Sequence, residues 1–207
     1  MRGRDIKRYG YVDNGLYLIN THNGVRGRIP RIKIEDYPAV KAHLDQYWDR
    51  IATRADKGDT PYNLRNCAYL EDFSRPKIIW KRIGSILRFS FDNKGCLGLD
   101  STCFATGEHI EYLCCILNSL MGHYLLKDSP KTGTGDLLVS VQAIEPACIP
   151  YNSQYERQLS TLLNRQINNP YDSSEKEIND IVFTMYDLSP KEREYVTQYI
   201  KLSQQSL

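Results

Sequence analysis

Basic residues interleaved with aromatic and amide side chains are the part of this sequence best suited to a chemical task. A guanidinium group can bind a guanine edge or a phosphate through two hydrogen bonds, and an asparagine amide can bind adenine in the same way. The residues of this kind are Arg2, Arg4, Lys7, Arg8 and Tyr9; Arg26, Arg28, Arg31 and Lys33; Tyr62, Asn63, Arg65 and Asn66; and Lys81 and Arg82, which follow Trp80. The pattern predicts a surface that contacts nucleic acid, although a solvated surface explains any one Lys or Arg taken alone.

The two halves of the chain differ in charge. Residues 1–100 contain 19 Lys and Arg against 12 Asp and Glu, whereas residues 101–207 contain 8 against 13, and the whole chain has a net charge of +2. Such asymmetry indicates a polyanionic partner for the basic half, with a solvated basic face as the alternative.

Further candidate phosphate contacts are Lys57, Lys131 and Thr132. The last two precede Gly133-Thr-Gly135, whose backbone amides could bind one phosphate. This segment lacks the glycine and lysine spacing of a nucleotide-binding P-loop. A flexible loop without a ligand is an equally good interpretation.

Motifs for catalysis fail their simplest tests. Asn168-Asn-Pro-Tyr171 is similar to the Asn-Pro-Pro-Tyr motif of amino methyltransferases, but Asn169 replaces a proline and no glycine-rich turn precedes it to bind a methyl donor. A helix-breaking turn is the simpler interpretation. The four histidines have no i, i+4 metal-binding pair, and no nucleophile elbow is present. We therefore expect no catalytic residue, no metal site and no cofactor in this chain.

Cysteine usage and hydropathy indicate a cytoplasmic protein. None of the six cysteines forms a C-x-x-C pair, and Cys114 and Cys115 lie in an apolar helical run. These residues are therefore expected to be small core residues in a reducing cytosol. No apolar run approaches ~18 residues, which predicts neither a signal peptide nor a membrane span.

Hydrophobic periodicity and turn residues predict the order of the elements. We expect a short strand at 16–19, a helix from Asp36 through Pro38 to about 55, paired strands at 77–83 and 86–91, a third strand at 96–104, a helix at about 108–126, a strand at 137–141, and helices at about 153–167, 174–186 and 190–203. Ser189 and Pro190 followed by Glu192 form a helix start signal.

This order predicts an α+β fold, in which a twisted mixed or antiparallel β-sheet with packed helices is followed by a helical C-terminal part. We expect residues 1–150 to form the α+β domain. Residues 151–207 are then a helical subdomain that packs on this domain or on a catalytic partner.

Taken together, several segments resemble a known family. They are Arg2-Gly-Arg-Asp-Ile-Lys-Arg-Tyr9, Leu18-Ile-Asn-Thr-His-Asn-Gly24, Ile34-Glu-Asp-Tyr-Pro38, Trp48, Asp59-Thr-Pro-Tyr-Asn-Leu-Arg-Asn-Cys-Ala-Tyr69, Arg75-Pro-Lys-Ile-Ile-Trp80, Leu117-Asn-Ser119 and Lys131-Thr-Gly-Thr-Gly135. The set resembles the C-terminal specificity domain of TaqI-type adenine-N6 DNA methyltransferases and of type IIG restriction-modification enzymes. It extends over about residues 2–200.

The resemblance implies a target-recognition module that reads double-stranded DNA and lacks catalytic activity of its own. A methyltransferase or nuclease catalytic domain, supplied in cis or in trans, would bind S-adenosylmethionine, with Mg²⁺ as a second candidate cofactor there. We therefore expect the chain to be a fragment or module of such an enzyme.

Two alternatives stay open. The acidic helical end at 151–207 could dock a separate methyltransferase or nuclease chain, as a protein-interaction subunit would. The chain could also be an enzyme in its own right, although the missing donor-binding loop argues against this.

Overall fold

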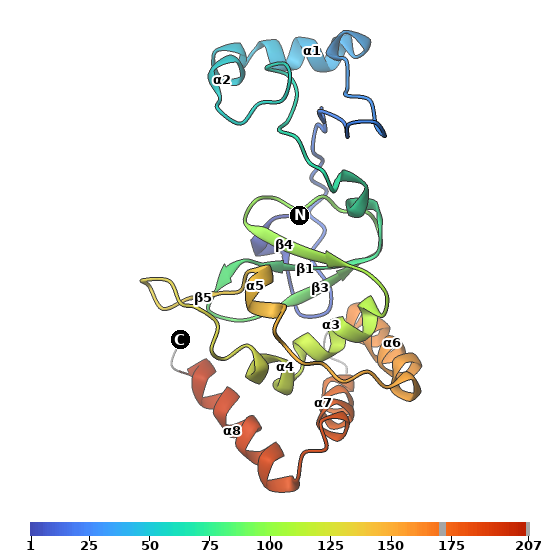
Figure 1. Ribbon diagram of the computed structural model, residues 1–207, viewed down its shortest axis with the longest axis vertical. Coiled ribbons are helices and arrows are strands. Elements are labelled where there is room, and N and C mark those ends of the chain that lie inside the picture. The colour runs from blue at the N-terminus through green and yellow to red at the C-terminus, as the bar shows by residue number, and fades with distance from the viewer. Residues whose placement is uncertain (170–172, 206–207) are drawn as a thin grey trace. The chain divides into compact units, whose positions relative to one another are not determined.

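The computed structural model describes residues 1–169 and 173–205, and the chain divides into two compact units (Figure 1). Unit 1 consists of residues 1–14 and 74–207, and unit 2 is the insertion of residues 15–73. Pro170 and Tyr171, the second half of the Asn168–Tyr171 segment, lie outside the described residues. The α+β fold predicted from the sequence is confirmed, with helices at the C-terminal end. The subdomain boundary predicted at residue 150 stays a prediction.

A three-stranded antiparallel sheet is the centre of unit 1. Strand β1 (Lys77–Lys81) lies between β3 (Phe89–Asp92) and β4 (Thr102–Thr106). Because the chain after β3 crosses to the far side of β1, β3 and β4 do not pair with each other as a hairpin. Strands β2 (Ile83–Gly84) and β5 (Leu137–Leu138) form a separate antiparallel pair.

The N-terminal segment extends the sheet on the outer side of β3. The Tyr9 amide donates to the Phe89 carbonyl at 2.9 Å, and the Phe91 amide donates to the Tyr9 carbonyl at 2.7 Å. The buried Ser90 hydroxyl also donates to the carbonyl oxygens of Lys7 and Gly10. These bonds fix residues 1–14 to unit 1 although unit 2 separates them from β3 in the sequence.

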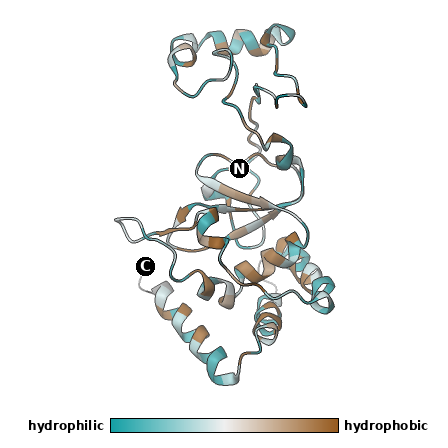
Figure 2. Ribbon diagram, viewed as in Figure 1, coloured by the Kyte–Doolittle hydropathy of each residue, from teal (hydrophilic) through white to brown (hydrophobic). Residues whose placement is uncertain are grey.

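The helices of unit 1 gather on one side of this sheet (Figure 1). They are α3 (Ile110–Asn118), α4 (Leu120–Leu125), α6 (Ser153–Asn168), α7 (Ser174–Met185) and α8 (Pro190–Gln205). The short α5 (Val141–Ile144) comes between β5 and α6 in the sequence. Helix α3 packs on β1 and β3, α6 packs on α3, α7 packs on α6, and α8 packs on α4. Figure 2 shows that apolar residues concentrate in the sheet and in α3.

The core around α3 includes both adjacent cysteines. Cys114 and Cys115 are fully buried, as expected of small core residues, and the six cysteines form no disulfide. Leu159 and Val182 pack into the same cluster from α6 and α7. The predicted C-terminal helices are confirmed within two residues at each end. Ser189 and Glu192 form the expected capping box, in which each side chain accepts a hydrogen bond from the other's backbone amide.

The helix predicted at 108–126 is two helices. Ser119 has an extended backbone between α3 and α4, and its hydroxyl accepts from the Gly122 amide at 3.0 Å as the N-cap of α4. A Cβ at Gly122 would lie 2.1 Å from the Ile116 carbonyl oxygen, so the sharp turn requires glycine there. The periodicity continues across the break, which is why it does not reveal the turn.

Unit 2 contains two short helices and little buried apolar surface. Helices α1 (Pro38–Asp45) and α2 (Trp48–Thr53) replace the single helix predicted to residue 55, and neither contains a buried residue. Short 3-10 turns occupy Gly3–Asp5 in unit 1, Ile34–Asp36 in unit 2, and Leu70–Ser74 at the end of unit 2. Helix α1 begins at Pro38 with Tyr37 as its N-cap, two residues after the start predicted at Asp36.

The strand predicted at 16–19 is wrong. The structure assigns no strand to these residues, and Tyr17 is 97% exposed. A short apolar run forms a strand only where another strand can satisfy its backbone. In the described part of the chain, no helix is sufficiently long and apolar to span a membrane.

Candidate nucleic-acid interface

A tight turn in unit 2 presents the second basic cluster of the sequence. The Arg28 amide donates to the Val25 carbonyl at 2.9 Å, and Val25 and Ile29 exchange backbone hydrogen bonds below the turn. Gly27 occupies the third position of the turn with a φ of +76°, as a type II turn requires. Arg26 therefore stands at the tip of a hairpin whose shape the glycine makes possible.

The buried amide of Asn63 holds the base of this hairpin. Its Nδ2 atom donates to the Ile32 carbonyl at 2.9 Å and to the His22 carbonyl at 3.4 Å, which lie on the two arms of the hairpin. Its Oδ1 atom accepts from the Thr60 hydroxyl at 2.7 Å. Because the side chain is only 2% exposed and occupied on both ends, Asn63 is a positioning residue and does not contact a ligand.

Asn23 ties the hairpin to the segment that follows α2. Its Oδ1 atom accepts from the Asp59 amide at 2.9 Å, and its Nδ2 atom donates to the Asp59 carboxylate at 3.0 Å and to the Asn66 side chain. A Cβ at Gly58 would lie 2.6 Å from the same Asn23 oxygen, so the close approach requires glycine. This network leaves Asn66 exposed at one side of the hairpin.

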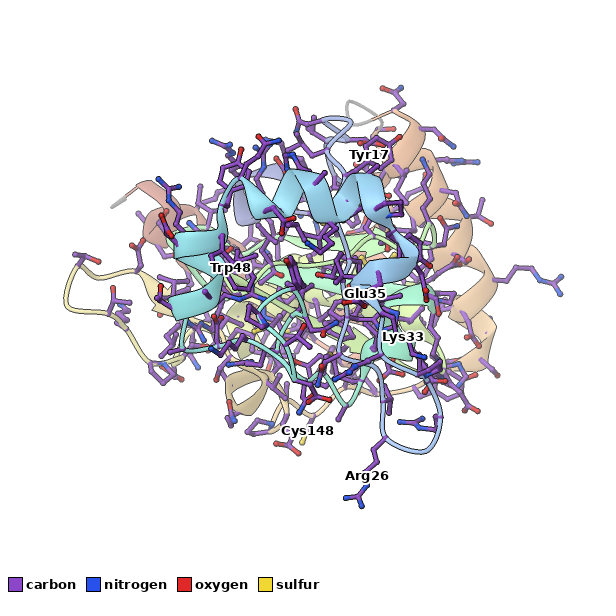
Figure 3. All side chains as sticks on the ribbon, turned by 90° about the horizontal axis from the view of Figure 1, so that it is seen from above. Tyr17, Arg26, Lys33, Glu35, Trp48 and Cys148 are labelled. Atoms are coloured by element: carbon purple, nitrogen blue, oxygen red, sulfur yellow. The ribbon has the colours of Figure 1, made fainter. Side chains whose placement is uncertain are left out.

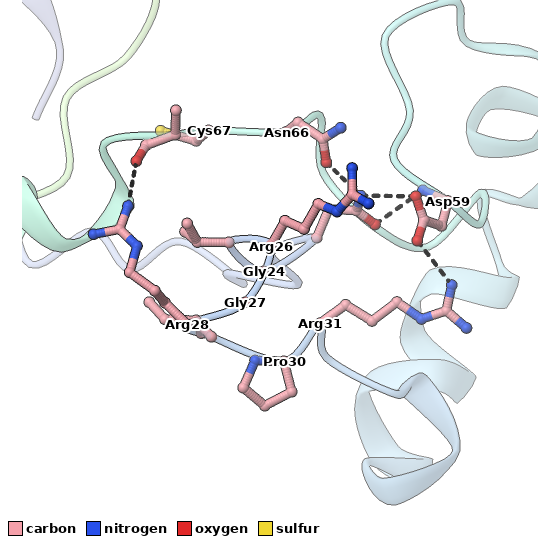
Figure 4. A pocket seen from close by; sticks show the side chains of 13 residues that line it. Gly24, Arg26, Gly27, Arg28, Pro30, Arg31, Asp59, Asn66 and Cys67 are labelled. Atoms are coloured by element: carbon pink, nitrogen blue, oxygen red, sulfur yellow. Dashed lines mark hydrogen bonds and ion pairs between the residues drawn. The ribbon is translucent and has the colours of Figure 1, made fainter.

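An open groove of about 840 Å³ lies between the hairpin and this segment (Figure 4). Arg28 reaches one wall, where it donates to the Ala68 carbonyl and pairs with Glu71 at 2.5 Å. Arg31 reaches the other wall and pairs with Asp59 at 3.2 Å. Both ion pairs are exposed, and such pairs contribute about 0–1 kcal/mol. The two guanidinium groups can therefore exchange their carboxylate partners for phosphate at little cost.

Other basic side chains of unit 2 extend into solvent. Arg26, Lys33 and Arg65 are exposed, and none has an ion-pair partner among the residues that the structure describes. Figure 3 shows the Arg26 side chain extending away from its loop. Lys57 differs, because its Nζ atom donates to the Ala52 carbonyl at 2.8 Å near the end of α2.

An aromatic pair lies beside the helices of unit 2. The rings of Trp48 and Tyr62 are 5.4 Å apart, and the Lys41 ammonium lies 5.3 Å from the centre of the Tyr62 ring. The Tyr62 hydroxyl donates to Asp45 at 2.6 Å. Hydrogen bonds from Lys41 and Tyr62 lower the pKa of Asp45, so this carboxylate stays charged. Trp48 is 44% exposed, and Tyr62 beside it is half-buried.

The basic residues predicted at the N-terminus divide into two kinds. Arg2 pairs with Asp5 at 2.9 Å, and Arg8 pairs with Glu175 of α7 at 2.6 Å and donates to the Asn118 carbonyl at 2.5 Å. These contacts are internal, so Arg2 and Arg8 stabilise unit 1. Arg4 and Lys7 are exposed, and so are Lys81 and Arg82 at the end of β1.

The loop predicted to bind phosphate is an ordered turn in unit 1. The Thr132 amide donates to the Asp136 carbonyl at 2.8 Å, the Gly135 amide donates to the Thr132 carbonyl at 2.9 Å, and the Thr132 hydroxyl bonds that of Thr134. Lys131 is exposed next to it. Two of the loop amides are therefore already occupied, which leaves the Lys131 ammonium as the stronger anion contact.

Sequence reasoning missed the buried polar residues that build unit 1. The Asn118 amide pairs with both backbone groups of Phe89, accepting from its amide at 3.1 Å and donating to its carbonyl at 2.7 Å. It thus attaches the end of α3 to β3 as another strand would. Trp80 is buried, and its indole N–H donates to the Val139 carbonyl. Leu117 is buried as well, whereas Tyr69 is 53% exposed.

Among the described residues, no group of three or more His, Cys, Asp or Glu side chains could hold a metal ion. The chain matches no protein-family model and no curated protein with which it was compared. The resemblance to TaqI-type specificity domains therefore stays a prediction.

Proposed function

We propose that this chain is a target-recognition module that binds double-stranded DNA, with unit 2 as its main reading surface. The observation that carries the proposal is the rigid hairpin, which holds Arg26 at its tip and Arg28 and Arg31 on either wall of the groove. Because the hairpin is already ordered, binding has to order only the side chains and not the loop, which lowers the entropy cost of contacting a base edge or a phosphate. The resemblance to specificity domains supports the same function.

The proposal assigns two roles. Arg26, with Arg65 and Asn66 beside the groove, is the best candidate for contact with base edges, because these side chains are exposed and bear the donors that fit guanine and adenine. The other exposed basic residues that the sequence analysis singled out would position the duplex through its phosphates. They are Arg4, Lys7, Arg28, Arg31, Lys33, Lys57, Lys81, Arg82 and Lys131.

In this proposal the chain contributes recognition and the catalytic domain is separate. S-adenosylmethionine, and Mg²⁺ where DNA is cleaved, would bind to that domain. The cytoplasm is the compartment in which such an enzyme would meet DNA.

Fluorescence anisotropy with a randomised duplex over a salt series tests the proposal. We expect binding that weakens steeply with salt, because each neutralised phosphate contributes about 0.9 to the slope of log K against log[salt]. Lys33→Ala should lower that slope by about one, while Lys201→Ala on α8 should leave it unchanged. Arg26→Ala should relax the sequence preference recovered by selection. Binding that does not depend on salt, or equal effects of the two lysine variants, would contradict the proposal.

A second candidate function rests on α8. Tyr195, Tyr199 and Leu202 recur at helical spacing, and their exposed fractions are 58%, 36% and 64%. This stripe could dock a catalytic chain, as a protein-interaction subunit requires. Co-purification with a methyltransferase or nuclease chain that is lost in Leu202→Glu, while DNA binding is retained, would favour it.

A further inference from the structure

Trp48 and Tyr62 form an aromatic surface in unit 2 that the proposed duplex contacts do not use. Trp48 is the first residue of α2, a helix that contains no buried residue, and it is 44% exposed. Its ring lies 5.4 Å from the ring of Tyr62, at an interplanar angle of 45°. We call this pair the aromatic platform. Because Trp48 is not part of a buried core, its indole is accessible to a partner.

Polar contacts fix the Tyr62 side of the aromatic platform. The Tyr62 hydroxyl donates to the Asp45 carboxylate at 2.6 Å. The Lys41 ammonium donates to the other oxygen of that carboxylate at 2.8 Å and lies 5.3 Å from the centre of the Tyr62 ring. The ring beside Trp48 is therefore held in place before any ligand binds. A rigid aromatic surface loses little conformational entropy on binding.

The aromatic platform is built on the same segment that supports the hairpin. Tyr62 directly precedes Asn63, whose amide holds the base of the hairpin. The Thr21 hydroxyl donates to the Tyr62 carbonyl at 2.7 Å, and the Leu64 amide donates to the Thr21 carbonyl at 2.9 Å. The two rings and the exposed arginines are therefore parts of one framework within unit 2. This favours a ligand that is both aromatic and polyanionic over an uncharged apolar one.

A nucleic acid strand has both properties, and an aromatic side chain next to a cation fits it. Bases inside a duplex are stacked on both faces, so only an unpaired base offers a free face to Trp48. We propose that the aromatic platform stacks an unpaired base of single-stranded nucleic acid, with Lys41 contacting an adjoining phosphate. The Lys41 and Asp45 side chains are both partly exposed, and exposed ion pairs are weak, so a phosphate can replace the carboxylate. The duplex contacts assigned above involve other residues, and the inference does not depend on them.

The test uses the unaltered chain and two oligomers of equal length and charge. One is an oligothymidylate, which forms no duplex, and the other has the same sugar–phosphate chain without bases. Tryptophan fluorescence reports the contact, because a stacked base quenches an exposed indole and the other tryptophan, Trp80, is buried. We expect oligothymidylate to quench the Trp48 component. It should bind at least about fivefold more tightly than the abasic oligomer, which is the factor that one stacked base contributes.

Three variants separate stacking from charge. Trp48→Leu should weaken oligothymidylate at least about fivefold in fluorescence anisotropy and leave the abasic oligomer unchanged. Trp48→Phe retains a ring and should retain most of the affinity. Tyr195→Leu is the matched control, because it removes an exposed aromatic ring from α8 in unit 1, and it should have no effect. Duplex binding should be the same in all three, and far-UV circular dichroism verifies that each is folded.

Several results would overturn the proposal. They are equal affinity for the two oligomers, equal effects of Trp48→Leu and Tyr195→Leu, and equal losses of single-strand and duplex affinity in Trp48→Leu. Quenching of Trp48 by a proline-rich peptide but not by oligothymidylate would also overturn it and would indicate a protein partner. If the unaltered chain binds oligothymidylate with quenching but binds no duplex, the proposed function fails and this inference stands.

Discussion

Lys77 and Asp92 form a buried ion pair across strands β1 and β3. They are register partners in the sheet, neither side chain has exposed surface, and the Lys77 Nζ atom lies 2.5 Å from an Asp92 oxygen. Asp92 also accepts from the Tyr11 hydroxyl at 2.9 Å and from the Cys96 amide at 2.9 Å. The pair therefore joins the N-terminal segment, two strands and the turn after β3 through one carboxylate.

Removing one partner of this pair should cost much stability. Asp92→Asn removes the carboxylate charge that faces the Lys77 ammonium inside the sheet, and breaking a buried ion pair costs about 3–5 kcal/mol. The free energy of unfolding from urea titration measures the loss. Asp100→Asn, at an exposed carboxylate, is the matched control and should change stability by less than about 0.5 kcal/mol. Equal effects of the two changes would mean that the pair contributes nothing.

Stability should fall in acid as two carboxylates become protonated. The Arg2 side chain, acting against burial, lowers the pKa of Asp5 to about 2. Burial raises the pKa of Asp92, but Lys77 and Tyr11 lower it by more, so that it also lies below its ordinary value. A depressed folded-state pKa gives stability that is fully present above the ordinary value of 3.8 and is lost as the pH falls through the folded value.

Thermal unfolding between about pH 2 and pH 6 measures this dependence. The midpoint should be level at the upper end and decline below about pH 4. Asp5→Asn should lower the midpoint at pH 6 and flatten the decline, since one of the titrating groups is gone. An unchanged decline in that variant would show that Asp5 does not contribute.

Glycine at the third position of the hairpin turn should be necessary for its shape. Gly27→Ala forces a side chain into positive φ, which costs about 1 kcal/mol. Gly133→Ala is the matched control, because its backbone lies outside that region and open space surrounds the new Cβ. Both variants should fold, and DNA affinity should fall in the first alone. If Gly27→Ala binds DNA as the unaltered chain does, the hairpin geometry is not required.

The Asn63 amide should be more important than the exposed Asn66 amide for the stability of unit 2. Asn63→Ala leaves the Ile32 carbonyl and the Thr60 hydroxyl without their side-chain partner, and the His22 carbonyl keeps only the Ile32 amide, so we expect a cost of about 1–3 kcal/mol. Asn66→Ala should cost less than about 0.5 kcal/mol. Hydrogen exchange of the Val25 and Ile29 amides follows the hairpin directly, and the reverse order of effects would refute the assignment.

The two tryptophans of the chain should differ in their access to a collisional quencher. Trp48 is 44% exposed, whereas Trp80 is 3% exposed with its indole N–H bonded inside the core. Iodide should therefore quench one component of the fluorescence, and Trp48→Phe should remove that component. A single class of tryptophan in the unaltered chain would contradict the burial described here.

The regular elements of unit 1 could be predicted because their sequences contain the signals that build them. Ser189, Pro190 and Glu192 start α8 by local hydrogen bonds, and Ile78 to Trp80 have the continuous apolar character of a central strand. The breaks at Ser119 and Gln46 could not be predicted, because the apolar periodicity of the sequence continues across both. The failure at 16–19 has another origin, since no other strand pairs with these residues.

The candidate site could be predicted only in part. Basic residue types mark Arg26, Arg28 and Arg31, and the structure brings these three together around one groove. Arg8 is of the same residue type, but it forms an internal ion pair with Glu175. Because Glu175 is 167 positions away in the sequence, no local pattern predicts this pair. The sequence likewise predicts that the Asn63 amide binds a ligand, whereas in the structure this residue is buried. Residue type therefore indicates which groups could bind, and burial decides which are free to do so.

The insertion of unit 2 between Asn14 and Ser74 has a consequence for the order of folding. The contact between Tyr9 and Ser90 closes a loop that contains all of unit 2. Closing a loop of this length costs conformational entropy before the contacts between its ends form. The cost slows folding when the residues between the two ends are unstructured. If unit 2 forms its hairpin and helices first, the unstructured part of the loop that must close between Tyr9 and Ser90 becomes much shorter. The sheet of unit 1 would then be completed last at its outer edge, by the segment that precedes unit 2 in the sequence.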